Sequence, residues 1–129
     1  MSKFINYLAV ILYLVPSSVF SCEPSQITVK KVDFSFVDRC DNLPRSCYQI
    51  SGVAVLNNSC STPVGVQLKL TGYDKDGAPV ATEEYWPASI RNLAPGDYVS
   101  SAPRQFHYDA RIARFELQVI DTKKWDEKH

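Results

Sequence analysis

The chain has no excess of charge of either sign, because its 14 Lys and Arg residues balance 14 Asp and Glu residues. A basic surface is the usual footprint of a protein that binds nucleic acid or an anionic membrane. The balance therefore excludes a strongly basic protein, and we expect nucleic acid not to be a partner.

Residues that bind metals are also scarce. The two histidines, His107 and His129, are not spaced with the four cysteines as zinc ligands are, and no CxxC pair occurs. Asp74 and Asp76 offer too few oxygen ligands for a calcium loop and suit a hairpin turn better. We expect neither a metal nor another cofactor.

Signs of catalysis are equally weak. His107, Asp109 and a serine such as Ser100 or Ser101 supply the residue types of a catalytic triad. No nucleophile-elbow or comparable motif accompanies them. The sequence therefore predicts a protein without catalytic residues.

The first 21 residues lack the length and the flanks of a stable membrane-spanning helix. Lys3 precedes an apolar run over Phe4–Val15, and Val19-Phe20-Ser21 offers a cleavage site after Ser21. This predicts a secretory signal peptide over residues 1–21 and a periplasmic or secreted mature chain without a membrane span. Residues Val19–Cys22 also loosely match a bacterial lipobox, so a lipid anchor on Cys22 is the alternative.

The rest of the chain shows the two-residue period of half-buried strands. The clearest alternation starts at Val64 and leads through the turn Asp74–Gly77 into a returning strand, Pro79–Tyr85, whose Glu83 and Glu84 suit a charged sheet edge. Further strands are expected over 27–36, 48–57, 98–101 with a resumption at 105–108, and 113–121. The expected core comprises Val64, Val66, Leu68, Leu70, Phe115, Leu117 and Val119. About seven short strands over 22–121, followed by a polar tail over 122–129, predict an all-β immunoglobulin-like sandwich.

Two irregularities are expected in the first pair of strands. The apolar alternation changes phase across Lys30 and Lys31, which predicts a β-bulge or a bend. Gly52 would weaken the second strand unless a neighbouring backbone or a bulky ring approaches it closely.

The four cysteines can be paired by the geometry of that hairpin. If 27–36 and 48–57 pair antiparallel, Phe36 lies opposite Tyr48 and Ile27 lies opposite Asn57. Cys40 and Cys47 then share the connecting loop, while Cys22 and Cys60 meet beyond the other end. Of the three possible pairings, only this nested one needs no cysteine to cross the length of the sheet.

Three short stretches resemble a known family. They are Gly52–Asn58 (GVAVLNN), Leu70–Gly77 (LTGYDKDG) and Leu93–Gly96 (LAPG). Together they resemble the FxLYD-type domain and similar bacterial immunoglobulin-like modules, although Leu70 and Gly72 stand where the family pattern has Phe and Leu. The resemblance implies a binding or spacer module of an envelope or surface protein.

Tyr85, Trp86 and Arg91 are the candidate partner-binding residues, because Trp, Tyr and Arg most often anchor protein interfaces. A tryptophan in a sandwich can equally belong to the core. We therefore expect an exported, non-catalytic interaction module that binds a protein partner in the cell envelope, of inhibitor, immunity or accessory type. The alternative is an accessory lipoprotein anchored through Cys22.

Overall fold

The computed structural model describes residues 22–40 and 42–126. The signal peptide predicted over residues 1–21 lies outside the described residues. Six strands follow a short 3-10 turn, η1 (Pro24–Gln26): β1 (Ile27–Asp38), β2 (Tyr48–Asn58), β3 (Gly65–Tyr73), β4 (Pro79–Tyr85), β5 (Gly96–Ser101) and β6 (Arg114–Lys123). In the described part of the chain, no helix has the length and apolar character needed to cross a bilayer.

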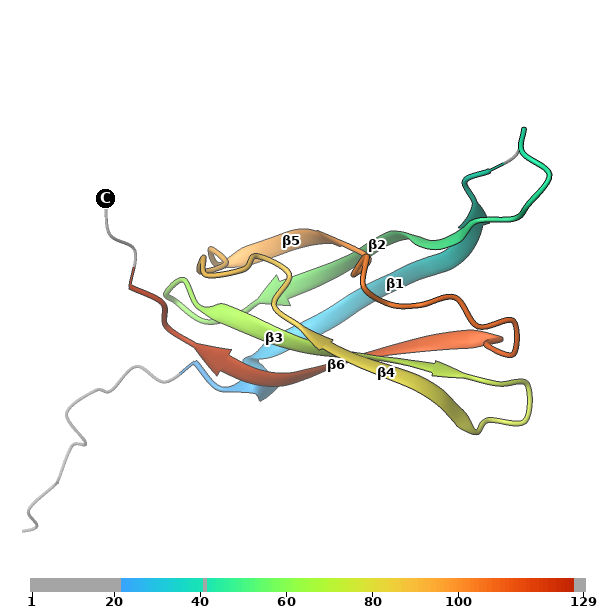
Figure 1. The fold of residues 1–129 in the computed structure, drawn as a ribbon. Helices are drawn as coiled ribbons and strands as arrows, with labels where there is room; N and C mark the ends of the chain where they lie inside the picture. Colours follow the sequence, from blue (N-terminus) through green and yellow to red (C-terminus); the bar gives the residue numbers. More distant parts are fainter. Residues whose placement is uncertain (1–21, 41, 127–129) are drawn as a thin grey trace, which may run out of the picture.

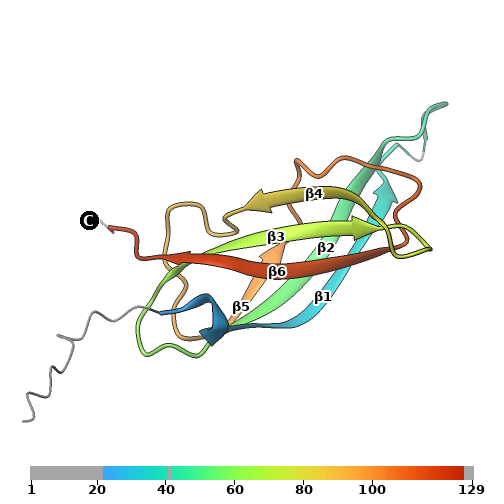
Figure 2. The same cartoon turned by 90° about the horizontal axis from the view of Figure 1, so that it is seen from below.

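The strands form two antiparallel sheets of three, in the orders β1-β2-β5 and β4-β3-β6. Figure 1 shows the two sheets as the layers of a small β-sandwich, and Figure 2 shows β4, β3 and β6 in front of the other sheet. The fold class is thus all-β, as predicted. β1 and β6 contact each other along one side of the sandwich.

The core lies between the sheets and contains the side chains that the alternation predicted. Val64, Val66, Leu68 and Leu70 are buried. Phe115, Leu117 and Val119 on β6 are partly buried and pack against that core. On β2, Ala54 and Leu56 are buried, whereas Val53 on the opposite face is exposed.

The strand expected at residues 105–108 does not form, so the sandwich has six strands among the described residues rather than about seven. This segment belongs to the loop that carries the chain from β5 in one sheet to β6 in the other. The backbone N–H of Phe106 donates to the carbonyl oxygen of Pro103, which makes a turn. The Phe106 and Tyr108 rings pack against Phe36 at centroid distances of 6.3 and 4.9 Å. The alternation therefore reflects ring packing by a loop and not a strand.

Both irregularities in the β1–β2 pair are present. The register shifts between Val29 and Lys31, which is the predicted bulge. Gly52 has φ +120°, and a Cβ atom there would lie 1.8 Å from the carbonyl oxygen of Asp33. Only glycine allows this close approach of the two backbones.

The predicted register of that hairpin was wrong by one to two residues. Phe36 lies opposite Ile50, and Ile27 lies opposite Asn58. The Asp38 carboxylate accepts the backbone N–H groups of Cys40 and Cys47, both at 2.9 Å. These bonds fix the base of the loop at Asp38, two residues beyond the predicted end of the strand at Phe36. The shift is two residues from Lys31 to Asp38, which preserves the face of each side chain, and one residue from Ile27 to Val29, on the other side of the bulge.

The nested disulfide pairing is confirmed. Cys22 is bonded to Cys60 and Cys40 to Cys47, and no described cysteine is free. The outer bridge fastens the start of β1 to the chain just beyond β2. β6 ends at Lys123, two residues beyond the predicted end of the last strand.

Candidate functional site

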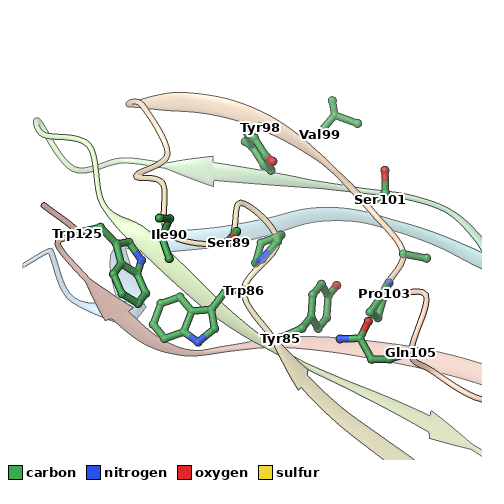
Figure 3. A pocket seen from close by; sticks show the side chains of 12 residues that line it. Tyr85, Trp86, Ser89, Ile90, Tyr98, Val99, Ser101, Pro103, Gln105 and Trp125 are labelled. Atoms are coloured by element: carbon green, nitrogen blue, oxygen red, sulfur yellow. The ribbon is translucent and has the colours of Figure 1, made fainter. Parts of the chain in front are cut away.

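A groove with a volume of about 530 Å³ opens between β4 and β5, on the side of the sandwich opposite the β1–β6 contact. The end of β4 and the following loop form one wall, and β5 with the start of the next loop forms the other (Figure 3). The residues that line it include aromatic and aliphatic residues from both walls and the chain beyond β6: Tyr85, Trp86, Ile90, Tyr98, Pro103 and Trp125. Ser89, Ser101 and Gln105 also line it, so the groove offers both aromatic surface and hydrogen-bonding groups.

Two tryptophans distant in sequence meet at one end of this groove. The Trp86 ring stands edge-on to the Trp125 ring, with centroids 5.3 Å apart. Trp125 packs closely over Gly65, where a Cβ atom would lie 2.3 Å from the indole nitrogen. Trp86 is partly buried, and its ring is held by the contact with Trp125 while part of its surface stays accessible.

An amide side chain holds Trp125 in place. Asn92 Oδ1 accepts the Trp125 backbone N–H, and Asn92 Nδ2 donates to the Trp125 carbonyl oxygen, both at 2.9 Å. The Lys123 ammonium lies 4.1 Å from the centroid of the indole ring, within the range of a cation–π interaction. Within the predicted polar tail, Trp125 is thus packed against the sandwich.

Tyr85 is buried beneath the groove, with 7% of its surface exposed. Its hydroxyl has no hydrogen-bond partner among the described residues. The neighbouring Ser100 hydroxyl donates to the Ser101 carbonyl oxygen at 3.2 Å. Burial strongly raises the pKa of Tyr85. Tyr85 therefore forms the floor of the groove and offers little direct contact.

Arg91 lies in the same β4–β5 loop but does not line the groove. The loop turns twice, with hydrogen bonds from Ser89 N–H to the Trp86 carbonyl and from Arg91 N–H to the Ala88 carbonyl. Ser89 adopts φ 57°. The Arg91 side chain is exposed.

The structure does not bring the candidate triad residues together. Asp109 binds Arg111 instead, with carboxylate–guanidinium contacts of 3.0 and 2.8 Å. The Arg111 side chain lowers the pKa of Asp109 to about 2. His107 is exposed, and among the described residues no hydrogen bond joins it to Asp109 or to either serine.

Asp74 serves as a turn residue. Its Oδ1 atom accepts the backbone N–H groups of Asp76 and Ala78, both at 2.9 Å, and Gly77 adopts φ +84°. These bonds hold the Asp74 carboxylate against the backbone of the turn. Within 22–40 and 42–126, no group of three or more His, Cys, Asp or Glu residues is placed to hold a metal ion.

Sequence reasoning did not find the second wall of the groove. Tyr98 and Val99 come from the other sheet, Pro103 from the loop after it, and Ile90 from a loop without a pattern. Trp125 was the one signal in sequence, because an aromatic residue in an otherwise polar tail has to be packed or exposed at a cost.

Comparisons with known proteins give no family for this chain. No protein-family model, no curated protein and no solved structure matches it. The resemblance of Gly52–Asn58, Leu70–Gly77 and Leu93–Gly96 to FxLYD-type domains stays a prediction.

Proposed function

We propose that this protein is an exported, non-catalytic interaction domain that binds a protein partner in the cell envelope. The observation that carries the proposal is the aromatic groove between β4 and β5, with Trp86 supported by Trp125 at one end. Aromatic side chains that are held rigidly lose little conformational entropy on binding, which makes them effective anchors.

The two disulfides support the export part of the proposal. Structural disulfides persist in oxidising compartments, such as the periplasm and the extracellular space. The Cys22–Cys60 bond also bears on the lipoprotein alternative, because a lipid thioether needs the sulfur atom that is used here in the disulfide. The disulfide at Cys22 therefore favours an interaction domain without a lipid anchor over the lipoprotein alternative.

Affinity capture tests the proposal. The full chain, with both disulfides formed, is immobilised and exposed to a native envelope extract in parallel with Trp86→Ala. A retained protein is then purified, and its dissociation constant is measured for both chains. We expect Trp86→Ala to weaken binding by about 2 kcal/mol or more, or about 30-fold, as at an interface hot spot.

Leu43→Ala is the control, because Leu43 is an exposed apolar residue and lies in the Cys40–Cys47 loop at the far end of the sandwich. His107→Ala and Asp109→Asn should leave binding unchanged if no catalytic group takes part. Circular dichroism checks that each variant keeps the fold. Equal affinity for wild type and Trp86→Ala would remove the groove from consideration.

A further inference from the structure

Four strands lie at sheet edges, and three of them carry features that discourage pairing with another chain. β1 has its bulge at Lys30, β4 carries Glu83 and Glu84, and β6 carries the exposed charges of Asp121 and Lys123. β5 has no bulge, no proline and an exposed apolar residue, Val99, at 62% exposure.

The one charge on β5 is neutralised within the sheet. Asp97 accepts a hydrogen bond from Asn57 on β2 and pairs with Lys30 on β1, both at 2.9 Å. Lys30 reaches across β2 because it is the bulged residue of β1. Charge on β5 therefore gives little protection against an added strand.

One hydrogen bond just beyond β5 shows which of its residues point their backbone N–H and C=O groups towards β2. The Ala102 N–H donates to the Gly52 carbonyl oxygen at 3.2 Å, in register with the β2–β5 ladder. Bonded and non-bonded pairs alternate in an antiparallel ladder. Ser100, Tyr98 and Gly96 therefore turn their backbone groups towards β2. Asp97, Val99 and Ser101 turn theirs outward, beside the groove.

A polar hollow of about 380 Å³ adjoins the end of this free edge and shares Ser101 and Ala102 with the groove. Arg39 and Arg104 both line it and are exposed. Arg39 donates to the Ser51 hydroxyl at 3.2 Å, and among the described residues neither arginine pairs with a carboxylate. Two uncompensated guanidinium groups favour an anionic group of a ligand at this end.

We infer that the partner contributes an extended segment that adds as a strand to the outer edge of β5. Alternate apolar side chains of that segment lie in the groove over Trp86 and Tyr98, and an acidic group at one end meets Arg39 and Arg104. Main-chain hydrogen bonds to Val99 and Ser101 supply affinity, while the groove and the arginines supply specificity. This inference rests on the proposed function, since it describes how the same groove would be used.

Selection from a displayed library of random decapeptides, on the full disulfide-bonded chain, tests the inference. We expect the selected peptides to alternate apolar and polar residues and to carry Asp or Glu at one end. A synthetic copy of the best peptide should bind Val99→Pro at least about tenfold more weakly, because proline removes an outward N–H that β2 does not use. Val99→Thr, which keeps that N–H, should bind like the wild type.

Arg104→Glu provides an independent reading, because Arg104 lies in an exposed loop and its replacement leaves β5 intact. It should weaken the acidic peptide about tenfold or more, and should affect a copy with Asn or Gln at the acidic positions far less. Peptides that bind Val99→Pro and Arg104→Glu as well as the wild type would overturn the inference. If Trp86→Ala still abolished their binding, the proposed function would stand without strand addition.

Two further outcomes would also overturn it. One is a library from which no peptide is enriched on the wild-type chain over a blank surface. The other is a wild-type dimer in sedimentation velocity that Val99→Pro converts to a monomer, which would place a second copy of this chain on β5. The capture experiment with Trp86→Ala tests the proposed function separately from both outcomes.

Discussion

β4 and β5 form the two walls of the groove, and both are edge strands, yet their exposed sides differ in chemistry. β4 presents carboxylates, with Glu84 exposed opposite Lys69 of β3. β5 presents Val99 and Ser101, and its single carboxylate is already paired with Lys30. The same sandwich therefore has one edge that repels an incoming strand and one that could accept it.

The difference lies in side chains and not in backbone architecture. Each of these strands is paired on one side only, β4 with β3 and β5 with β2. Protection and binding can therefore be exchanged by substitution, without a change of fold. The substitutions below change either residues that hold the edge strands in place, such as Cys22 and Asn58, or residues of the edge strands, such as Glu84 and Asp97.

The largest expected effect is loss of the outer disulfide, which fastens the sheet that carries β5 and has no counterpart in the sheet that carries β4. Cys22 and Cys60 are 38 residues apart, and Cys40 and Cys47 are 7 apart. On the chain-entropy relation, replacing the outer pair with serines should cost about 4 kcal/mol, and replacing the inner pair about 2.5 kcal/mol. Urea unfolding at neutral pH measures both values.

The inner-pair variant is the control for the loss of any disulfide. An equal cost for the two double variants would contradict the loop-length argument. It would also mean that the sheet of β5 does not depend specifically on the Cys22–Cys60 bridge.

Asn58→Leu should weaken the connection between the two edges. The buried Asn58 amide accepts the Cys60 N–H at 2.9 Å and donates to the carbonyl oxygen of Leu93, in the β4–β5 loop, at 3.0 Å. A leucine would leave the Cys60 N–H without its partner, at a cost of about 1–3 kcal/mol in the free energy of unfolding. Chemical denaturation measures it.

Asn57→Ala is the neighbouring control, since Asn57 is only partly buried and its amide bonds the exposed Asp97. It should cost about 0.5–1.5 kcal/mol, as for an ordinary hydrogen bond. An Asn58→Leu chain no less stable than Asn57→Ala would show that the buried amide does not hold the loop.

Glu84→Val should give β4 the character of β5. The variant removes an exposed charge from an edge strand and adds an apolar, β-branched residue, so we expect concentration-dependent association. Glu84→Asp keeps the charge and should associate no more than the wild type does. Multi-angle light scattering across a concentration series compares them, and a Glu84→Val chain whose mass does not rise would show that charge does not protect this edge.

Much of this fold was predictable because buried faces follow the two-residue period, as from Val64 to Leu70. The expected strand at 105–108 failed because Phe106 and Tyr108 gain their packing from Phe36 in another element, and a local pattern does not reveal that contact. The hairpin register failed for a similar reason, since it depends on where the Asp38 carboxylate binds two backbone N–H groups.

The candidate site was predictable by residue type and not by geometry. Tyr85 and Trp86 were identified because aromatic residues anchor interfaces, and both line the groove. Tyr98 and Trp125 could not be assigned to the same groove, because they come from segments that only the tertiary fold brings together. Arg91 was grouped with Trp86 by sequence proximity alone, and it does not line the groove.

The smallest expected effect concerns the pairing of Asp97, which distinguishes the two edges electrostatically. The Asn57 amide, and then the Lys30 ammonium, hold the pKa of Asp97 below its usual value. A carboxyl group with a depressed folded-state pKa stabilises the fold above its unfolded-state pKa, near 4, and this contribution is lost as pH falls through the folded-state value. Stability should therefore decline below about pH 4. The carboxyl groups of Asp38 and Asp109, whose pKa values are also lowered, add to that decline.

Asp97→Asn isolates the share of this decline that belongs to β5. The variant should show a shallower acid slope than the wild type in urea unfolding between pH 5 and about pH 2, because it has no carboxyl group to protonate at this position. High salt should narrow the gap, since the ion pair with Lys30 is half exposed. Identical slopes at low salt would mean that neither Asn57 nor Lys30 stabilises the charge on β5, and that this edge carries an uncompensated carboxylate as β4 does.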